Sequence, residues 1–178
     1  MFGKISSMLR NGPVVLVSRK IEFTFPLSYA YLAGYLREMG EDVRILFKPS
    51  SSQFSVFVKQ IMDMKPVLVG FGSLYPELSE IRKLIRMLND AGRQFPIVIG
   101  GQMVTPTPKF AVEITGSDFG VLGEGEITLH RLVTALREGK DPASVKGLVV
   151  RQGDEVTFTG PGEFIEDLSR LPRIPYDL

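Results

Sequence analysis

The sequence predicts an α/β domain built around a parallel sheet, and two features carry that prediction. Short apolar runs rich in Val and Ile alternate along the chain with segments whose apolar residues recur at helical spacing. The loops between them are brief and contain Gly or Pro. Because strands that alternate with helices are joined by crossovers, they form a parallel sheet that is covered by helices on both faces.

Five apolar runs are the expected strands of this sheet. Parallel strands are buried on both faces, so they are nearly continuous runs of apolar residues and do not alternate with polar ones. The expected strands span residues 13–18, 42–47, 67–71, 96–100 and 118–122.

Helical patterns lie between these strands. Pro26 suits the first turn of a helix, because its fixed φ matches the helix and its missing N–H is not needed there. Leu27, Ala30 and Tyr31 begin the apolar stripe of this helix, and Gly40 ends it. Further helices are expected over residues 52–64, 76–91, 105–114 and 126–138.

Five such units with right-handed crossovers form a doubly wound open sheet. The predicted strand order is 2-1-3-4-5, the flavodoxin-like arrangement within the Rossmann-like folds. After residue 140 the pattern changes, because two strand-like runs flank Gln152-Gly153-Asp154 and predict a β-hairpin. The proline-containing tail has weak periodicity and is expected to be a linker. The predicted divisions are an α/β domain (1–140), a hairpin appendage (141–160) and a linker (161–178).

Composition excludes several classes of function. The 21 basic and 20 acidic residues nearly cancel, so there is no electrostatic case for binding nucleic acid or a membrane surface. No apolar run approaches the roughly 20 residues that span a bilayer, and the N-terminus is too polar for a secretory signal. We therefore expect a cytoplasmic protein. With no Cys and only one His, His130, the chain offers no disulfide, catalytic thiol, cysteine-held iron–sulfur cluster or multi-histidine zinc site.

Three glycine-containing loops follow predicted strands, at the edge where open α/β sheets bind ligands. They span Gly70–Tyr75, Gly100–Thr105 and Gly123–Glu126. Glycines let a large flat ligand approach the backbone, but a Gly-Gly pair is also common in tight turns, and Glu126 also favours the N-terminus of a helix. None of the loops matches a dinucleotide fingerprint or a P-loop, and no nucleophile or base marks a catalytic centre. His130 is expected to be a half-buried surface residue.

Taken in order, the motifs of this chain resemble the N-terminal part of the B12-binding radical-SAM protein family. They are a proline-led helix ending in Gly (26–40), VGFGSLYPEL (69–78), IVIGGQMVTPTP (97–108), DFGVLGEGE (118–126) and LSRLPRIPYDL (168–178). In that family, a hairpin and a linker of this kind lead into a radical-SAM barrel with a C-x-x-x-C-x-x-C loop. The resemblance covers nearly the whole chain from residue 13.

The resemblance implies a domain that holds cobalamin in front of a catalytic barrel. The barrel, with its S-adenosylmethionine and 4Fe-4S cluster, lies outside this sequence, and it is the partner that the resemblance implies. Without it, the chain is expected to catalyse no radical reaction by itself.

The resemblance also implies which residues hold the cofactor. The nucleotide tail of cobalamin would enter between the loops after the third and fourth strands, where Ser73 and Thr105 are candidate hydrogen-bond partners. The corrin ring would lie over the strand ends near the apolar side chains of Phe23, Phe25, Leu74 and Tyr75. The implied cofactor-binding residues are Gly72, Ser73, Leu74, Tyr75, Gly100, Gly101, Thr105, Gly123, Glu124 and Gly125.

One departure from related domains concerns the cobalt. Cobalamin domains such as that of methionine synthase have a D-x-H-x-x-G loop after the first strand, and its histidine is the lower cobalt ligand. Residues 19–25 read RKIEFTF here, so the resemblance implies cobalamin held without a histidine ligand. Two functions remain open. One is a cobalamin-binding module of a methyltransferase- or cyclase-like radical-SAM enzyme, and the other is a cobalamin-free flavodoxin-like domain with a structural or protein-interaction role.

Overall fold

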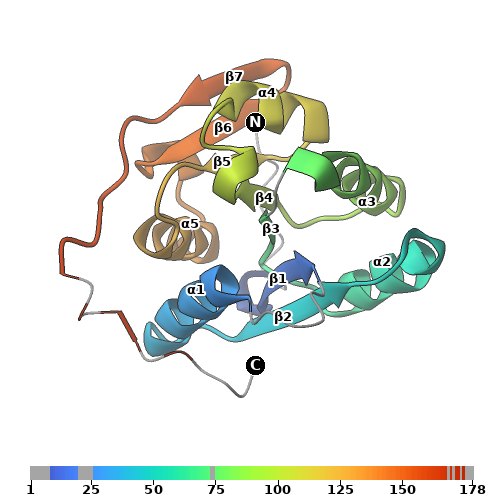
Figure 1. The fold of residues 1–178 in the computed structure, drawn as a ribbon, viewed down its shortest axis with the longest axis horizontal. Helices are drawn as coiled ribbons and strands as arrows, with labels where there is room; N and C mark the ends of the chain where they lie inside the picture. Colours follow the sequence, from blue (N-terminus) through green and yellow to red (C-terminus); the bar gives the residue numbers. More distant parts are fainter. Residues whose placement is uncertain are drawn as a thin grey trace.

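A single sheet organises the part of the chain that the computed structural model describes, which is residues 9–19, 26–72, 75–167, 169, 171, 172 and 174. Within these residues the sheet has seven strands in the order β2-β1-β3-β4-β5-β6-β7 (Figure 1). The first five strands are parallel, as predicted, and the predicted order 2-1-3-4-5 is confirmed. The predicted hairpin continues the same sheet, because β6 pairs with β5 in antiparallel fashion. The strands are β1 (Val14–Arg19), β2 (Val43–Lys48), β3 (Leu68–Gly72), β4 (Ile97–Gly100), β5 (Phe119–Val121), β6 (Leu148–Gln152) and β7 (Glu155–Phe158).

The helices connect these strands, and two short 3-10 turns, η3 (Tyr75–Glu77) and η4 (Gly101–Met103), follow β3 and β4. The fourth helix begins later than predicted. Residues that precede a proline avoid the helical region, and Thr107, before Pro108, has φ −140° and ψ 66°. The helices are α1 (Leu27–Glu38), α2 (Phe54–Asp63), α3 (Leu78–Asp90), α4 (Pro108–Thr115) and α5 (Glu126–Glu138).

The helices form a layer on each face of the sheet. Helices α1 and α5 cover one face, while α2, α3 and α4 cover the other (Figure 1). Successive strand residues point to opposite faces, so each parallel strand contributes apolar side chains to both cores. In β1, for example, Leu16 packs beneath α1 and α5, and Val17 packs beneath α2 and α3.

The buried face of α1 differs from the stripe that the sequence predicts. Tyr29, Ala30 and Ala33 are buried, whereas Leu27, the expected first member of the stripe, is 52% exposed. The difference arises because the hydroxyl of Tyr29 finds backbone partners at the ends of β1 and β3, so this polar-tipped side chain is buried at no loss of hydrogen bonding.

Arginine side chains tie together the loops at the amino ends of the parallel strands. Arg93 donates to Asp118 Oδ2 at 2.7 Å, and the same oxygen accepts from the N–H of Ile97 at 2.7 Å. Arg151 donates to the carbonyl oxygen of Ser117 at 2.8 Å. These contacts join the loops that lead into β4 and β5 to the hairpin.

A second arginine network lies at the same edge, where α5 ends. Arg137 pairs with Glu41, which precedes β2, with Nε at 2.9 Å from Oε2. It also donates to the carbonyl oxygens of Arg10 and Gly12, which precede β1. The amino ends of β1 and β2 are thereby attached to the last turn of α5.

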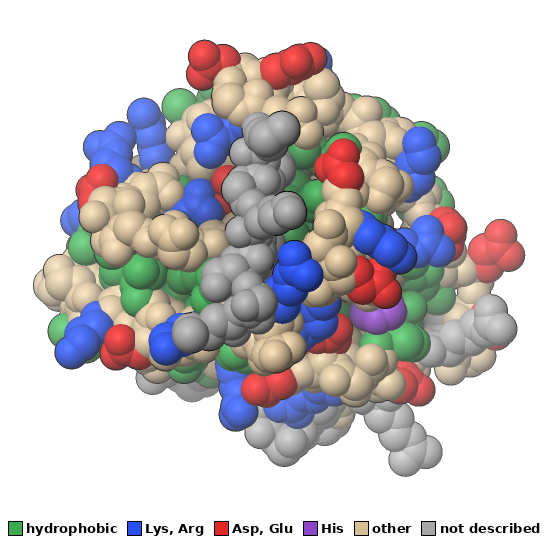
Figure 2. Space-filling view, turned by 180° about the vertical axis from the view of Figure 1, so that it is seen from behind, with side chains coloured by type: hydrophobic (Ala, Val, Ile, Leu, Met, Phe, Trp, Pro, Cys, Tyr) green, Lys and Arg blue, Asp and Glu red, His purple; other side chains and the backbone are tan. Residues whose placement is uncertain are grey.

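The described surface has mixed charge. Figure 2 shows acidic and basic side chains interspersed on one face, as the balanced composition predicts. Within the described ranges, no helix is long and apolar enough to cross a membrane. Nor do these ranges contain a group of three or more His, Cys, Asp or Glu side chains that could hold a metal ion.

Candidate functional site

A cavity of about 500 Å³ lies at the carboxyl ends of β1, β3 and β4, between α1 and α5. Its position follows from the topology. The crossover after β1 runs over one face of the sheet and the crossover after β3 runs over the other, so the two chains part and leave a crevice at their strand ends. This is the size of pocket that commonly holds a small molecule or a cofactor.

The sheet contributes two tiers of residues to this cavity. Leu16, Gly70 and Val98 are neighbours in register and form the floor. Two residues further along the strands, Gly72 and Gly100 are paired and form the tier at the mouth. Because strand side chains alternate, both tiers face α1 and α5.

The two helices form the walls. Leu32 of α1 and Leu129 of α5 line the cavity, together with Val121 at the end of β5. The helices approach closely at Gly125, because a Cβ on this residue would lie 2.9 Å from Cδ2 of Leu32. Gly125 is therefore required for the contact between α5 and α1 that closes the outer side of the cavity.

The adjacent glycines 100 and 101 have different roles. Gly101 has φ +80°, a left-handed conformation that strains other residues. Gly100 has an extended backbone with φ −151°, which any residue adopts. A Cβ on Gly100 would meet only the Cβ of Val121, at 4.0 Å, so a side chain here would occupy cavity space without straining the chain. Gly101 serves the turn, whereas Gly100 serves the cavity.

Tyr29 holds the strand ends at the mouth. Its hydroxyl can donate its one proton to the carbonyl oxygen of Val17, at 2.7 Å, or of Gly72, at 2.5 Å, and it accepts from the N–H of Gly72 at 2.7 Å. Burial raises the pKa of the Tyr29 phenol; the hydrogen bond with the Gly72 backbone opposes this effect, and the charge of Glu77 adds to it. The phenol is therefore a neutral cross-link between β1 and β3.

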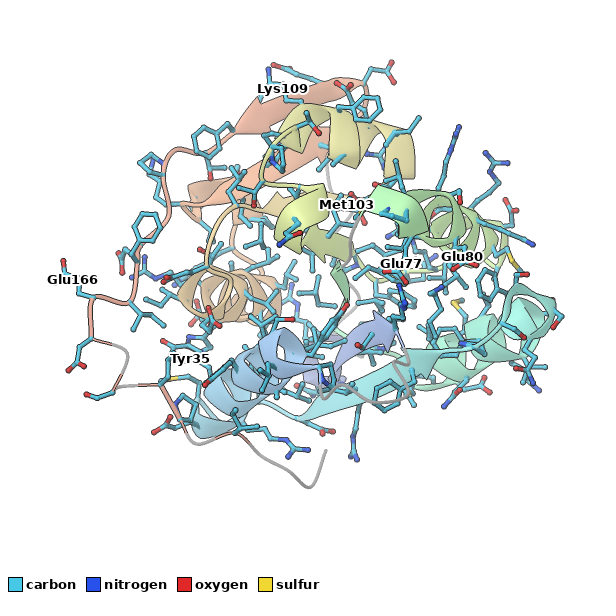
Figure 3. The ribbon with its side chains drawn as sticks, in the orientation of Figure 1. Tyr35, Glu77, Glu80, Met103, Lys109 and Glu166 are labelled. Carbon is cyan, nitrogen blue, oxygen red and sulfur yellow. The ribbon has the colours of Figure 1, made fainter. Side chains whose placement is uncertain are left out.

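Charged side chains surround one side of the mouth. Glu77 Oε1 lies 3.9 Å from Nε of Arg19 and 4.0 Å from Nζ of Lys48, and the side chains of Glu77 and Lys48 are only 12% and 11% exposed. Lys48 also pairs with Glu80, which lies close to Glu77 at the start of α3 (Figure 3). Arg19 and Glu77 line the cavity, so this ion-pair group is part of its wall.

On the other side of the mouth, the segment after the hairpin runs along the start of α5. The Ile165 N–H donates to Oε2 of Glu124 at 3.0 Å. Arg131 donates to both carboxylate oxygens of Glu163, at 2.8 and 2.7 Å. A Cβ on Gly123 would lie 3.8 Å from the Phe164 ring. The Gly123–Glu126 loop therefore contacts both the cavity and the segment that the sequence predicts to be a linker.

The structure brings most of the sequence-predicted site residues together. The cavity is lined by Gly72, Gly100, Gly101, Gly123, Glu124 and Gly125. Thr105 is not among the lining residues, and its hydroxyl donates to the carbonyl oxygen of Gly101 at 3.3 Å. Tyr75 belongs to the turn η3. Ser73, Leu74, Phe23 and Phe25 lie outside the described residues.

Sequence reasoning missed several lining residues. These include Tyr29 and Leu32, whose helical spacing gave no sign that they face a cavity. His130 is half-buried, as predicted. Its ring makes an edge contact with Tyr35, with centroids 6.2 Å apart, and it is not among the cavity-lining residues.

Comparison with known proteins agrees with this geometry. A family model described as "B12 binding domain" matches residues 14–133. The chain is 30% identical over 155 residues to an uncharacterized methyltransferase of Pyrococcus horikoshii, covering 86% of this chain and 34% of the relative. It is 30% identical over 181 residues to the anaerobic magnesium-protoporphyrin IX monomethyl ester cyclase of Synechocystis, covering 96% of this chain and 35% of the relative.

Solved structures show the same fold. The radical S-adenosylmethionine methyltransferase TsrM of Kitasatospora setae, solved with cobalamin and a [4Fe-4S] cluster bound, superposes with a TM-score of 0.71 at 24% identity. The match covers 89% of this chain and 30% of TsrM. The chain therefore spans about a third of the length of the proteins that it most resembles.

Proposed function

The chain belongs to the B12-binding domain family, and on this premise we propose that it is the cobalamin-binding module of a methyltransferase- or cyclase-like radical-SAM enzyme. The observation that carries the proposal is the cavity at the switch point between β1 and β3, with an apolar floor and the open position of Gly100 at its mouth. The activity of a whole enzyme is part of the proposal, because the relatives are about three times as long as this chain.

The shape of the cavity supports a ligand with a tail and a broad head. The nucleotide tail of cobalamin would occupy the slot between the sheet and the helix pair α1 and α5. The corrin would lie at the mouth, where Gly72 and Gly100 leave the strand ends without side chains. The residues proposed to hold the cofactor are those predicted from the sequence together with Tyr29, Leu32 and Leu129.

The charge at the mouth favours cobalamin over the anionic ligands of other flavodoxin-like domains. Three carboxylates line the cavity, those of Glu77, Glu124 and Glu126, against the single guanidinium of Arg19. A flavin mononucleotide or a nucleoside triphosphate would meet more negative than positive charge. The corrin instead carries uncharged amide groups and a cationic metal, and carboxylates can accept hydrogen bonds from those amides.

We propose further that the cobalt receives no histidine ligand from this chain. The sequence has one histidine, and His130 packs against Tyr35 on α5 and is not a lining residue. When bound, cobalamin would supply a cobalt centre able to carry a methyl group. S-adenosylmethionine and the [4Fe-4S] cluster are assigned to a separate radical-SAM barrel.

The residues of this chain would bind and orient the cofactor. The Tyr29 hydroxyl fixes the distance between β1 and β3, and so the width of the mouth. The contact of Leu32 with Gly125 keeps water from the outer side of the slot. Glu124 is held by the Ile165 N–H, so the segment beyond the hairpin forms part of the rim.

The test is a titration of the purified protein with hydroxocobalamin, followed by the corrin absorbance bands. We expect saturable binding that Gly100→Leu weakens by at least about 100-fold, because a leucine side chain would fill the mouth. Gly100→Ala is the matched control and should retain binding, since its Cβ has room beside Val121.

Absence of saturable binding up to millimolar hydroxocobalamin would contradict the proposal. It would favour the alternative, a cobalamin-free domain with a structural or protein-interaction role. Equal affinity in the wild type and Gly100→Leu would mean that cobalamin binds elsewhere on the protein.

A further inference from the structure

We propose that the floor of the slot selects corrinoids by their lower base, favouring an apolar benzimidazole over a purine such as adenine. This inference rests on the proposed function and goes beyond it, because it names the chemical class of the group that fills the slot. It depends on which polar atoms the slot offers to a base.

The floor and walls of the slot are apolar. Leu16, Val98 and Leu129 are 2%, 3% and 4% exposed and line the cavity from β1, β4 and α5. Leu32 and Val121 complete the walls. Among the described lining residues, the polar side chains belong to strand ends, helix starts and loops, at the mouth.

The polar groups nearest the floor already have partners. The Tyr29 hydroxyl is engaged by the backbone of Val17 and Gly72. The Ser18 hydroxyl donates to the carbonyl oxygen of Arg19 at 3.2 Å. The backbone of Leu16, Gly70 and Val98 lies within three paired parallel strands, where N–H and C=O groups bond across the ladder.

The two kinds of base differ at the edge that would reach this floor. A 5,6-dimethylbenzimidazole presents two methyl groups and C–H bonds. An adenine presents ring nitrogens and an exocyclic amine, which would leave water without finding partners. One buried unpaired polar group costs enough to lower affinity by about tenfold, and two would cost more.

The experiment compares three corrinoids by equilibrium titration with absorbance detection. They are cobalamin, its analogue with adenine as the lower base, and cobinamide, which has no nucleotide tail. We expect cobalamin to bind at least about tenfold more tightly than the adenine analogue and more tightly than cobinamide.

Two variants locate the selectivity. Val98→Thr places a hydroxyl at the floor with little change of shape, and Leu32→Gln places an amide on the wall. Either should narrow the preference for cobalamin over the adenine analogue. Val14→Thr is the matched control, because Val14 is buried in the same core and is not a lining residue of the cavity. It should leave the preference unchanged.

The outcomes separate this inference from the proposed function. Equal binding of cobalamin and its adenine analogue, or equal binding of cobinamide, overturns the selection by the floor while cobalamin binding stands. A preference that neither Val98→Thr nor Leu32→Gln narrows overturns it as well, because the slot would not be its source. No binding of any of the three corrinoids refutes the proposed function, and the inference with it.

Discussion

The two ends of the parallel strands are built by different means. At the amino ends, Arg93, Asp118 and Arg137 join neighbouring loops through ion pairs and hydrogen bonds to backbone groups. At the carboxyl ends, Gly72 and Gly100 face a cavity. One edge is filled with fixed polar side chains, and the other lacks side chains where the cavity opens.

This difference implies that stability and binding are carried by opposite edges of one sheet. Changes at the amino edge should lower the free energy of unfolding and leave cobalamin affinity intact. Changes at the carboxyl edge, such as Gly100→Leu, should do the reverse. Four further variants sharpen or break this separation, and they follow from the largest expected effect to the smallest.

Asp118→Ala should give the largest loss of stability. It leaves Arg93 without its carboxylate and the N–H of Ile97 without its acceptor in a site where the Asp118 side chain is only 14% exposed. We expect the free energy of unfolding to fall by about 3 kcal/mol in urea denaturation. Asp154→Ala, in the exposed hairpin turn, is the control and should change it little. A tenfold loss of cobalamin affinity in folded Asp118→Ala would break the separation of the two edges.

Arg137→Ala tests the second network at the amino edge. The change removes an ion pair with Glu41 and hydrogen bonds to the carbonyl oxygens of Arg10 and Gly12. We expect the free energy of unfolding to fall by about 2 kcal/mol, measured by the same method. Arg86→Ala, on the exposed surface of α3, should have no comparable effect. An Arg137→Ala protein as stable as the wild type would show that this network does not stabilise the edge.

Tyr29→Phe should affect both properties, because Tyr29 is a hydrogen-bonding side chain at the carboxyl edge. Loss of the hydroxyl leaves the Gly72 N–H unpaired, so we expect a stability loss of about 1–2 kcal/mol together with weaker cobalamin binding. Tyr31→Phe, on the same helix, is the control. Unchanged affinity and stability in Tyr29→Phe would show that the cross-link between β1 and β3 has no effect on the mouth.

Tyr29 also predicts a dependence of stability on pH. Because burial raises the pKa of its phenol above the usual value of 10.0, the folded state holds this proton more tightly than the unfolded state. Its contribution is fully present below pH 10 and is lost as the pH rises further, by up to about 1.4 kcal/mol per pH unit. The loss above pH 10 should be shallower in Tyr29→Phe. Identical alkaline slopes for the two proteins would contradict the assignment.

Arg131→Ala should have the smallest effect. The Arg131 and Glu163 side chains are 46% and 58% exposed, and exposed ion pairs stabilise proteins by less than about 1 kcal/mol. We expect a change near the limit of measurement in urea denaturation, and a smaller one at high salt. A loss above 2 kcal/mol would mean that the segment after the hairpin is part of the stable core.

The fold was predictable because its signals are local. Alternating apolar runs and helical patterns identified each strand and helix, and Gly40, Gly92 and Gly139 each have a positive φ after a helix, as the sequence predicts for such glycines. The start of α4 was missed because two closely spaced prolines, Pro106 and Pro108, left its first turn ambiguous.

The cavity was only partly predictable. The loop glycines stand out in the sequence, and six of the ten predicted site residues line the cavity. Tyr29 and Leu32 do not stand out, because their role depends on how α1 packs against α5 and on the hydrogen bonds at two strand ends that are distant in sequence. A tyrosine that faces a cavity has the same local pattern as its neighbour Tyr31, which does not line it.

The two adjacent glycines give a way to sort sequences that share this fold. A side chain in place of Gly101 strains the turn, so it is a change that selection for folding alone would remove. A side chain in place of Gly100 is compatible with the backbone and closes the cavity. Position 100 therefore separates two lineages that a fold comparison would merge. One retains a place for a cofactor, and the other keeps the scaffold for a different use.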